Sequence, residues 1–280
     1  ENYKVNPLSP NNMKQYIVKT YSGLMLGALS LFPLSSNATV VATEHFDYAD
    51  GSNNLSGGSG GTGWSGNWTT DGTSFDVADG AAFTGDLDAF RNTRTLTSAQ
   101  STGTLYIAWT GEKQRTQDIS ETQVLALSGM SNGGTTEEFS MQFRTSNATN
   151  EFFLLYGGSD RSDAASDTGG TYTEGTEITF VVEIVFDGTA GDETISAWAF
   201  TGGPPSTLGT ALLTQSAPIN SGIDSILLQS NGKRMTGSLD NIVIATEYSD
   251  ILGVIPEPST YAALFGIAAM SFAFIRRRRV

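Results

Sequence analysis

The feature that most restricts the fold of this 280-residue chain is a regular two-residue alternation within Glu177–Phe186. Apolar side chains occupy every second position of this segment: Ile178, Phe180, Val182, Ile184 and Phe186. A period of two places them on one face of a β-strand. The turn-forming residues Asp187–Asp192 follow, and Glu193–Phe200 resumes a strand pattern. Together the segments predict a β-hairpin.

Six further segments have strand character, and clusters of Gly, Asn, Asp and Ser separate them: Leu105–Thr110, Thr122–Leu127, Glu138–Arg144, Phe152–Tyr156, Ser225–Gln229 and Ser238–Ala245. No internal segment combines a helical period with capping residues. Many short strands joined by turns predict a jelly-roll β-sandwich. We therefore expect an all-β domain over residues 39–253, flanked by an N-terminal signal helix and a C-terminal transmembrane helix.

The composition excludes several kinds of site. The chain has no Cys and one His, His45, which excludes cysteine nucleophiles, disulfides and multi-histidine metal centres. Its 15 basic and 29 acidic residues give a net charge of -14, which argues against nucleic acid as a partner. The 32 glycines, with abundant Ser, Thr and Asn, are typical of an extracellular β protein.

Residues 13–38 have the three parts of a secretory signal peptide. Two lysines precede the apolar run Leu24–Leu34, and small residues follow it up to Ala38. We expect export through the Sec translocon and cleavage after Ala38, with Ala42 as the alternative position. The apolar run is short for a membrane span of about 20 residues. A core helix or an uncleaved anchor is the other interpretation. Residues 1–12 are interpreted as an upstream extension.

The tail, residues 254–280, also has three parts. A proline motif, an uncharged run and a basic cluster follow one another: Pro256, Glu257, Pro258, Ser259 and Thr260, then Tyr261–Ile275, then Arg276, Arg277, Arg278 and Arg279. As a helix the run would extend about 22 Å. Arginine snorkelling can extend it toward the roughly 30 Å hydrocarbon core of a bilayer. The arginines are expected to stay cytoplasmic and anchor the helix, with the domain outside.

This order of motif, apolar run and arginines resembles the PEP-CTERM sorting signal of Gram-negative bacteria. The resemblance implies recognition by exosortase, removal of the tail near Pro256–Thr260, and delivery to the cell surface or extracellular matrix. An ordinary single-span membrane anchor that stays in place is the alternative.

The domain between the two ends carries a second resemblance. Glu44–Tyr48 with the following Gly61–Trp68, and the closing segment Leu239–Tyr248, are similar to the ends of surface domains that carry this tail. Those domains resemble the concanavalin A-like (laminin G-like) jelly roll. The resemblance implies the same fold here, and this fold often holds calcium.

Aromatic side chains are the first candidates for a glycan-binding site. Trp64 and Trp68 lie in a glycine-rich loop, where exposed rings could stack on sugars and buried rings could instead anchor the loop. Trp109 and Trp198 lie within strand patterns and are expected in the core.

Calcium is the only cofactor that the sequence suggests. Asp160, Asp163 and Asp167 share one polar loop, although they do not match the EF-hand pattern. A solvated acidic surface is the simpler interpretation of this loop.

No catalytic residue is predicted. The paired carboxylates of a jelly-roll glucanase are absent, and Glu183 with Asp187 or Glu137 with Glu138 are poorly placed to replace them. His45 is expected to be a structural or exposed residue rather than a base. Three hypotheses remain: a non-catalytic surface or matrix protein associated with exopolysaccharide, a lectin-like glycan-binding module, and a glycosidase with a non-standard site.

Overall fold

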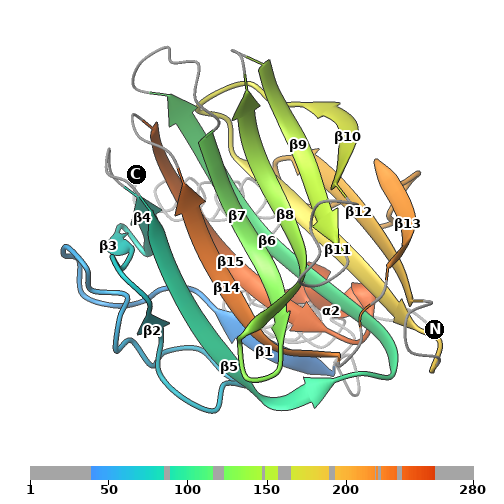
Figure 1. Ribbon diagram of the computed structural model, residues 1–280, viewed down its shortest axis with the longest axis horizontal. Coiled ribbons are helices and arrows are strands. Elements are labelled where there is room, and N and C mark those ends of the chain that lie inside the picture. The colour runs from blue at the N-terminus through green and yellow to red at the C-terminus, as the bar shows by residue number, and fades with distance from the viewer. Residues whose placement is uncertain are drawn as a thin grey trace, which may run out of the picture. The chain divides into compact units, whose positions relative to one another are not determined.

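The computed structural model describes residues 39–84, 89–115, 123–146, 149–156, 165–188, 193–217, 219, 222–231 and 235–255. The predicted signal peptide and the tail from Pro256 lie outside these residues. Within the described part of the chain, two antiparallel sheets form a β-sandwich, and the predicted all-β fold is confirmed (Figure 1).

One sheet has eight strands. They are β1 (Val40–Glu44), β3 (Asp76–Ala78), β4 (Ala81–Thr84), β6 (Gly103–Arg115), β11 (Ile178–Phe186), β12 (Glu193–Thr201), β13 (Leu213–Ala217) and β15 (Met235–Ala245). Their order is β13-β12-β11-β6-β15-β4-β3, and β1 also pairs with β15.

The other sheet has seven strands. They are β2 (Thr69–Thr70), β5 (Phe90–Gln100), β7 (Gln123–Ser131), β8 (Thr136–Ser146), β9 (Thr149–Tyr156), β10 (Ala165–Thr171) and β14 (Ile223–Asn231). Their order is β10-β9-β8-β7-β14-β5-β2.

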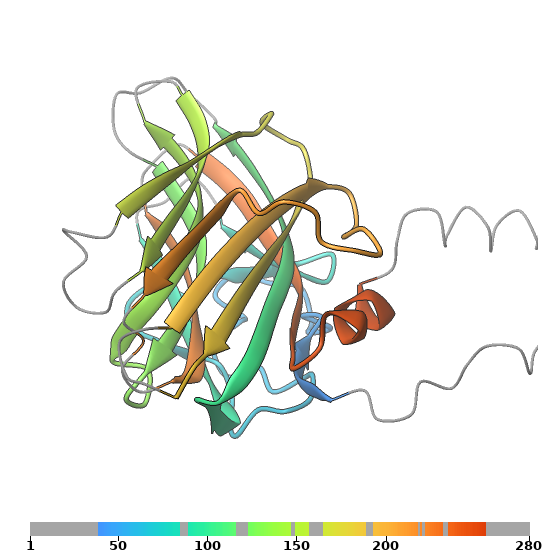
Figure 2. The same cartoon turned by 90° about the vertical axis from the view of Figure 1, so that its right-hand side faces the viewer.

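The main hydrophobic core lies between the sheets, which Figure 2 shows nearly edge-on. The alternation that predicted β11 places Phe180, Val182 and Ile184 in this core, each with 0% exposure. Trp109 of β6 stacks near Phe180, with ring centroids 5.1 Å apart. The predicted burial of Trp109 is therefore confirmed.

A second, smaller core covers the outer face of the eight-stranded sheet. Helix α2 (Tyr248–Val254) lies against this face (Figure 2), and Ile251 and Ile255 pack on Val181 and Val243. Trp198 belongs to this core, as predicted for a buried ring, and its Nε1 donates a hydrogen bond to the Gly209 carbonyl at 3.0 Å. The α2 helix is too short to cross a bilayer, and no other described helix could do so.

All eight predicted strands are present, with bounds that differ by a few residues. The sequence analysis did not predict β1–β5, β10, β13 or α2. These elements are either short or carry polar residues on their inward face. The longest of them, β5, buries Asn92 and Arg94, so it lacks a purely apolar alternation.

Candidate functional site

The glycine-rich loop between β1 and β2 is held against β1 by backbone contacts. The amide of Thr43 donates to the Thr62 carbonyl at 3.0 Å, and the Thr62 amide donates back at 3.1 Å. Gly61 and Gly63 have φ angles of +70° and +82°. A Cβ on Gly61 would lie 2.0 Å from the Thr43 oxygen. These glycines are therefore required by a close backbone approach as well as by their conformation.

Beneath this loop lies a buried ion pair between Glu44 of β1 and Arg94 of β5. Their side chains are 1% and 2% exposed. The Glu44 carboxylate also accepts hydrogen bonds from the Phe46 amide at 2.8 Å and the Tyr48 hydroxyl at 2.7 Å. Arg94 Nε donates to the Gly66 carbonyl at 3.0 Å. The pair therefore links the two sheets to both ends of the loop.

Trp64 and Trp68 complete this group of side chains, which we call the anchor cluster: Glu44, Tyr48, Trp64, Trp68 and Arg94. Trp68 is 1% exposed, and its Nε1 donates to Glu44 Oε2 at 3.1 Å. Trp64 is half-buried and donates to the Thr43 carbonyl at 2.8 Å. The Arg94 guanidinium carbon lies 5.0 Å from the Trp64 ring centre and 5.7 Å from that of Trp68.

These contacts favour the anchoring interpretation of Trp68. A ring with 1% exposure offers no flat face to a sugar, so Trp68 anchors the loop. Trp64 keeps part of its surface accessible beside the same loop.

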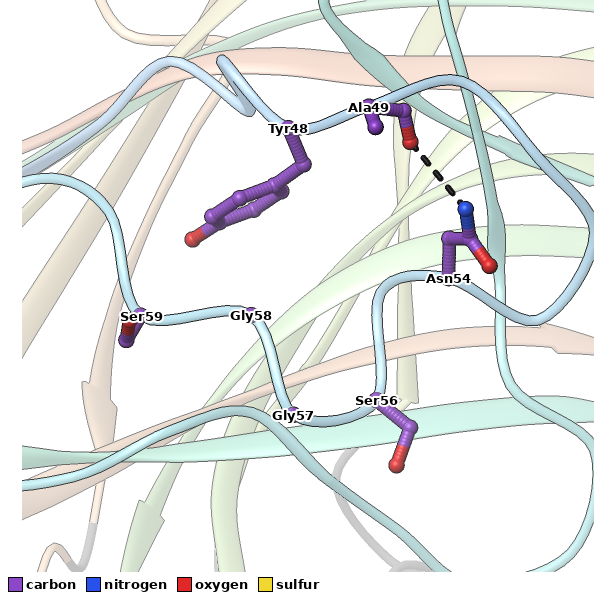
Figure 3. Close-up of a pocket in the computed structure, with 7 residues that line it drawn as sticks. All are labelled: Tyr48, Ala49, Asn54, Ser56, Gly57, Gly58 and Ser59. Atoms are coloured by element: carbon purple, nitrogen blue, oxygen red, sulfur yellow. Dashed lines mark hydrogen bonds between the residues drawn. The ribbon is translucent and has the colours of Figure 1, made fainter.

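A shallow, open pocket of about 420 Å³ is lined by Tyr48 and by part of the loop. Tyr48 lies on one side, and the polar residues Asn54, Ser56 and Ser59 are among the others that line it (Figure 3). Gly58 lies so close to the Tyr48 ring that a Cβ there would be 2.9 Å from Cζ. The pocket lining contains no carboxylate and no basic side chain.

Tyr48 connects the pocket to the anchor cluster. Burial, and the hydrogen bond from its hydroxyl to the Glu44 carboxylate, raise the pKa of Tyr48 to about 12. The phenol is therefore neutral at physiological pH and acts as a hydrogen-bond donor with an aromatic face. Its oxygen accepts a hydrogen bond from the Gly60 amide at 3.0 Å, which fixes the ring beneath the loop.

His45 has a structural environment. Its Nδ1 lies 3.1 Å from Asn241 Oδ1, at the point where the register of β15 shifts between Asp240 and Val243. Asn241 adopts a φ of +51° there, and its amide and side chain donate to the Asp240 carboxylate.

Protonation of Asp240 is expected to make the stability of the fold depend on pH. Burial raises the pKa of this carboxyl from 3.8 to about 6, and the nearby Glu177 and Asp47 also raise it, while the Asn241 hydrogen bond and His45 lower it. Asp240 then binds a proton more tightly in the folded chain than in the unfolded chain. Its contribution to the free energy of unfolding therefore increases as the pH falls from about 7 toward 4.

The effect of Asp240→Asn measures this contribution. Relative to the variant, we expect the wild type to gain about 1 kcal/mol of unfolding free energy between pH 7 and pH 5, allowing for partial solvent screening. Urea denaturation of both proteins at the two pH values gives the difference. An equal response of the two proteins to acidification would contradict the assignment.

Three further carboxylates, two of them buried, have structural partners. Glu193 accepts the Ile219 amide at 3.1 Å, and Glu138 accepts the Ser131 hydroxyl. Glu183 accepts the Tyr106 hydroxyl at 2.6 Å, and burial together with this bond raises the pKa of Tyr106 to about 12. None of these carboxylates lines the described pocket.

The proposed calcium ligands lie mostly outside the described residues. Asp160 and Asp163 fall there, and Asp167 lies in β10, in a stretch whose side chains are not described. Across the ranges that are described, no group of three His, Cys, Asp or Glu side chains could hold a metal ion.

Sequence reasoning identified the loop and its tryptophans but not Glu44 or Arg94. The signal that could have identified Arg94 is its position in the alternation of β5. Phe90, Asn92, Arg94 and Leu96 share one face of this strand, so a charged residue lies among inward-facing positions.

Solved structures share the fold. The globular domain of T. cruzi calreticulin superposes with a TM-score of 0.52 at 9% identity, over 78% of this chain and 92% of that one. The carbohydrate recognition domain of Emp47p gives a TM-score of 0.47 at 11% identity, over 75% and 99%. The exoplasmic/lumenal domain of VIP36, in a Ca²⁺/Man-bound form, gives 0.46 at 10% identity, over 65% and 83%. At such identities the likeness concerns the fold alone.

No curated protein matches the chain significantly in sequence. Residues 254–279, however, match the PEP-CTERM protein-sorting motif. The match spans the proline motif, the uncharged run and the four arginines, and it begins where α2 ends. This motif implies export and exosortase-mediated delivery to the surface or the extracellular space. The chain is therefore a two-sheet β-sandwich that carries a PEP-CTERM protein-sorting motif at residues 254–279.

Proposed function

We propose that this protein is a non-catalytic component of the bacterial cell surface or extracellular matrix, associated with exopolysaccharide. The sorting motif carries the proposal. In the proposed pathway the Sec translocon exports the chain, and the uncharged run Tyr261–Ile275 holds it in the membrane with Arg276–Arg279 on the cytoplasmic side. Exosortase then removes the tail, and the sandwich is released to the surface or matrix.

The arrangement of α2 supports this order of events. Ile255, the last residue that the structure describes, is 2% exposed, and the proline motif follows it directly in the sequence. The proline rings disfavour continuation of the helix. A cut near Pro256–Thr260 would therefore keep every described residue of the two hydrophobic cores.

A non-catalytic role is supported by the carboxylates. Glycoside hydrolysis needs two carboxyl groups about 5–9 Å apart across a substrate site. The lining of the pocket has no carboxyl group. Glu44, the buried carboxylate nearest in sequence to the lining residue Tyr48, is paired with Arg94.

A lectin-like function is the second candidate, favoured by the pocket beside Tyr48. Its amide and hydroxyl groups next to a neutral aromatic ring suit hydrogen bonding and stacking with a sugar. Calcium held by the Asp160–Asp167 loop could contribute, since bridging cations would offset repulsion between an acidic protein and anionic polymers.

Filling the pocket tests this function. We expect Ser56→Tyr to weaken binding to the recognised polysaccharide by about tenfold or more, because it places a bulky ring at a residue that lines the pocket. Binding is measured with mature protein on a polysaccharide panel, with calcium and with a chelator. Thr102→Tyr, an exposed position in the β5–β6 turn, is the matched control.

The outcomes separate the hypotheses. Saturable binding that Ser56→Tyr abolishes and Thr102→Tyr retains would establish a lectin, and its loss on chelation would assign a role to calcium. Binding that neither substitution alters would place the glycan elsewhere on the domain. The absence of binding to every polysaccharide would contradict the association and leave a surface protein of purely structural role.

A further inference from the structure

The first and last described segments of the domain meet at a buried carboxylate. The backbone nitrogen of Thr39 donates to Asp250 Oδ2 at 2.8 Å, although the residues are 211 positions apart. The Thr39 carbonyl accepts the Thr246 amide at 3.3 Å, which continues the pairing of β1 with β15. The entry to β1 is thereby fixed against the first turn of α2.

Among the described residues, the Thr39 amide is the one hydrogen-bond donor to the Asp250 carboxylate. Its side chain is 8% exposed, and no cation contacts it within the described part of the chain. A buried carboxylate with one neutral donor lacks most of the stabilisation that water would provide. An ammonium in place of the Thr39 amide would supply the missing charge at the same position.

We propose that cleavage of the Ala38–Thr39 bond creates this ammonium, so that the new N-terminus forms an ion pair with Asp250 and secures α2 ahead of the sorting motif. The inference rests on the proposed export. In the hydrolysis, water adds hydroxyl to the Ala38 carbonyl carbon, the C–N bond breaks, and the Thr39 nitrogen leaves as an amine. That amine takes up a proton from solvent, because a free α-amino group has a pKa of about 8.

The structure also distinguishes the two cleavage positions suggested by the sequence. Cleavage after Ala42 would remove Val40–Ala42, which form most of β1, and with them the pairing of Val40 and Ala42 with β15. It would also remove the Ala42 side chain from the core, where it is fully buried. Cleavage after Ala38 keeps every contact of β1 and adds a charge next to Asp250.

The ion pair would make α2 docking depend on N-terminal processing. Before cleavage, Asp250 accepts one neutral amide hydrogen bond. After cleavage, it faces a positively charged donor, and charge-assisted hydrogen bonds are about twice as strong as neutral ones. The segment that leads into the sorting motif would therefore be held most firmly in the exported, processed protein.

The test uses the full chain, expressed in a Gram-negative host that has signal peptidase but no exosortase. N-terminal sequencing and intact mass identify the first residue. Acetic anhydride then labels amines in the folded protein at neutral pH, and peptide mass spectrometry measures acetylation of the N-terminal amine. We expect Thr39 as the first residue, with an amine that reacts about tenfold more slowly than in Asp250→Asn, because an ion pair protects it.

Two further variants remove ambiguity. An alanine inserted after Ala38 moves the amine by about 3.5 Å and leaves Asp250 unchanged, so protection should be lost even if Asp250→Asn folds poorly. Asp224→Asn also removes a carboxylate that accepts a backbone amide, from Gly133 at 2.7 Å, and should react like the wild type.

Equal acetylation rates in the wild type and the insertion variant would overturn the ion pair. A mature protein that begins at Thr43 would overturn the assigned cleavage position and leave the export proposal intact. Retention of residues 13–38 would contradict export as well. Tail processing plays no part in this host, so the result is independent of exosortase.

Discussion

Replacement of Arg94 by methionine is expected to lower the free energy of unfolding by about 3–5 kcal/mol, because it leaves Glu44 charged and buried. Glu44 is fully buried and accepts three further hydrogen bonds, from Phe46, Tyr48 and Trp68. The variant also loses the contact between Arg94 and the Gly66 carbonyl. Both effects weaken the attachment of the glycine-rich loop to the two sheets.

Urea denaturation measures the change, and Arg91→Met provides the control. Arg91 lies on the same strand with an exposed side chain, so its replacement removes the same charge without disturbing a buried partner. We expect the control to change stability by less than about 0.5 kcal/mol. A loss of similar size in both variants would mean that net charge, rather than the Glu44–Arg94 pair, determines the effect.

Replacement of Pro256, Glu257 and Pro258 by alanine is expected to abolish tail removal. The protein should then accumulate in the membrane fraction with its tail intact, because the motif that precedes the membrane run is no longer recognised. Fractionation of an exosortase-containing strain, followed by intact mass measurement, detects the retained tail.

Two comparisons make this experiment specific. The unmodified chain in a strain without exosortase should give the same retained form. Pro204→Ala, in the loop between β12 and β13, should be processed normally, since it changes a proline outside the motif. Normal release of the triple-alanine variant would refute the sorting assignment.

The sequence predicted those strands whose inward positions are apolar. The β11–β12 hairpin is the clearest example, because its period of two is unbroken and a turn cluster follows it. Strand β5 was not predicted, since Asn92 and Arg94 occupy two of its inward positions. Helix α2 has seven residues and no side-chain N-cap, so neither a helical period nor a cap was visible.

The candidate site was predicted only in part, for a related reason. The glycine-rich loop is local in sequence, and its need for an anchor follows from its composition. The pairing of Glu44 with Arg94 spans 50 positions, and only the packing of the two sheets brings these residues together. The sequence left open whether the rings of Trp64 and Trp68 stack on sugars or anchor the loop. Their exposure depends on the packing of the sheets, which buries Trp68 and leaves Trp64 half-exposed.

The attachment of α2 has a mechanical consequence for a protein tethered at its C-terminal side. A pull applied at Ile255 reaches the domain through a seven-residue helix that is held mainly by Tyr248, Ile251 and Ile255. The strand before it, β15, is hydrogen-bonded to β1, β4 and β6. Under load, the packing contacts of α2 would break before the hydrogen bonds between β15 and its neighbouring strands. The helix would thus act as an extensible link that protects the sandwich from rupture.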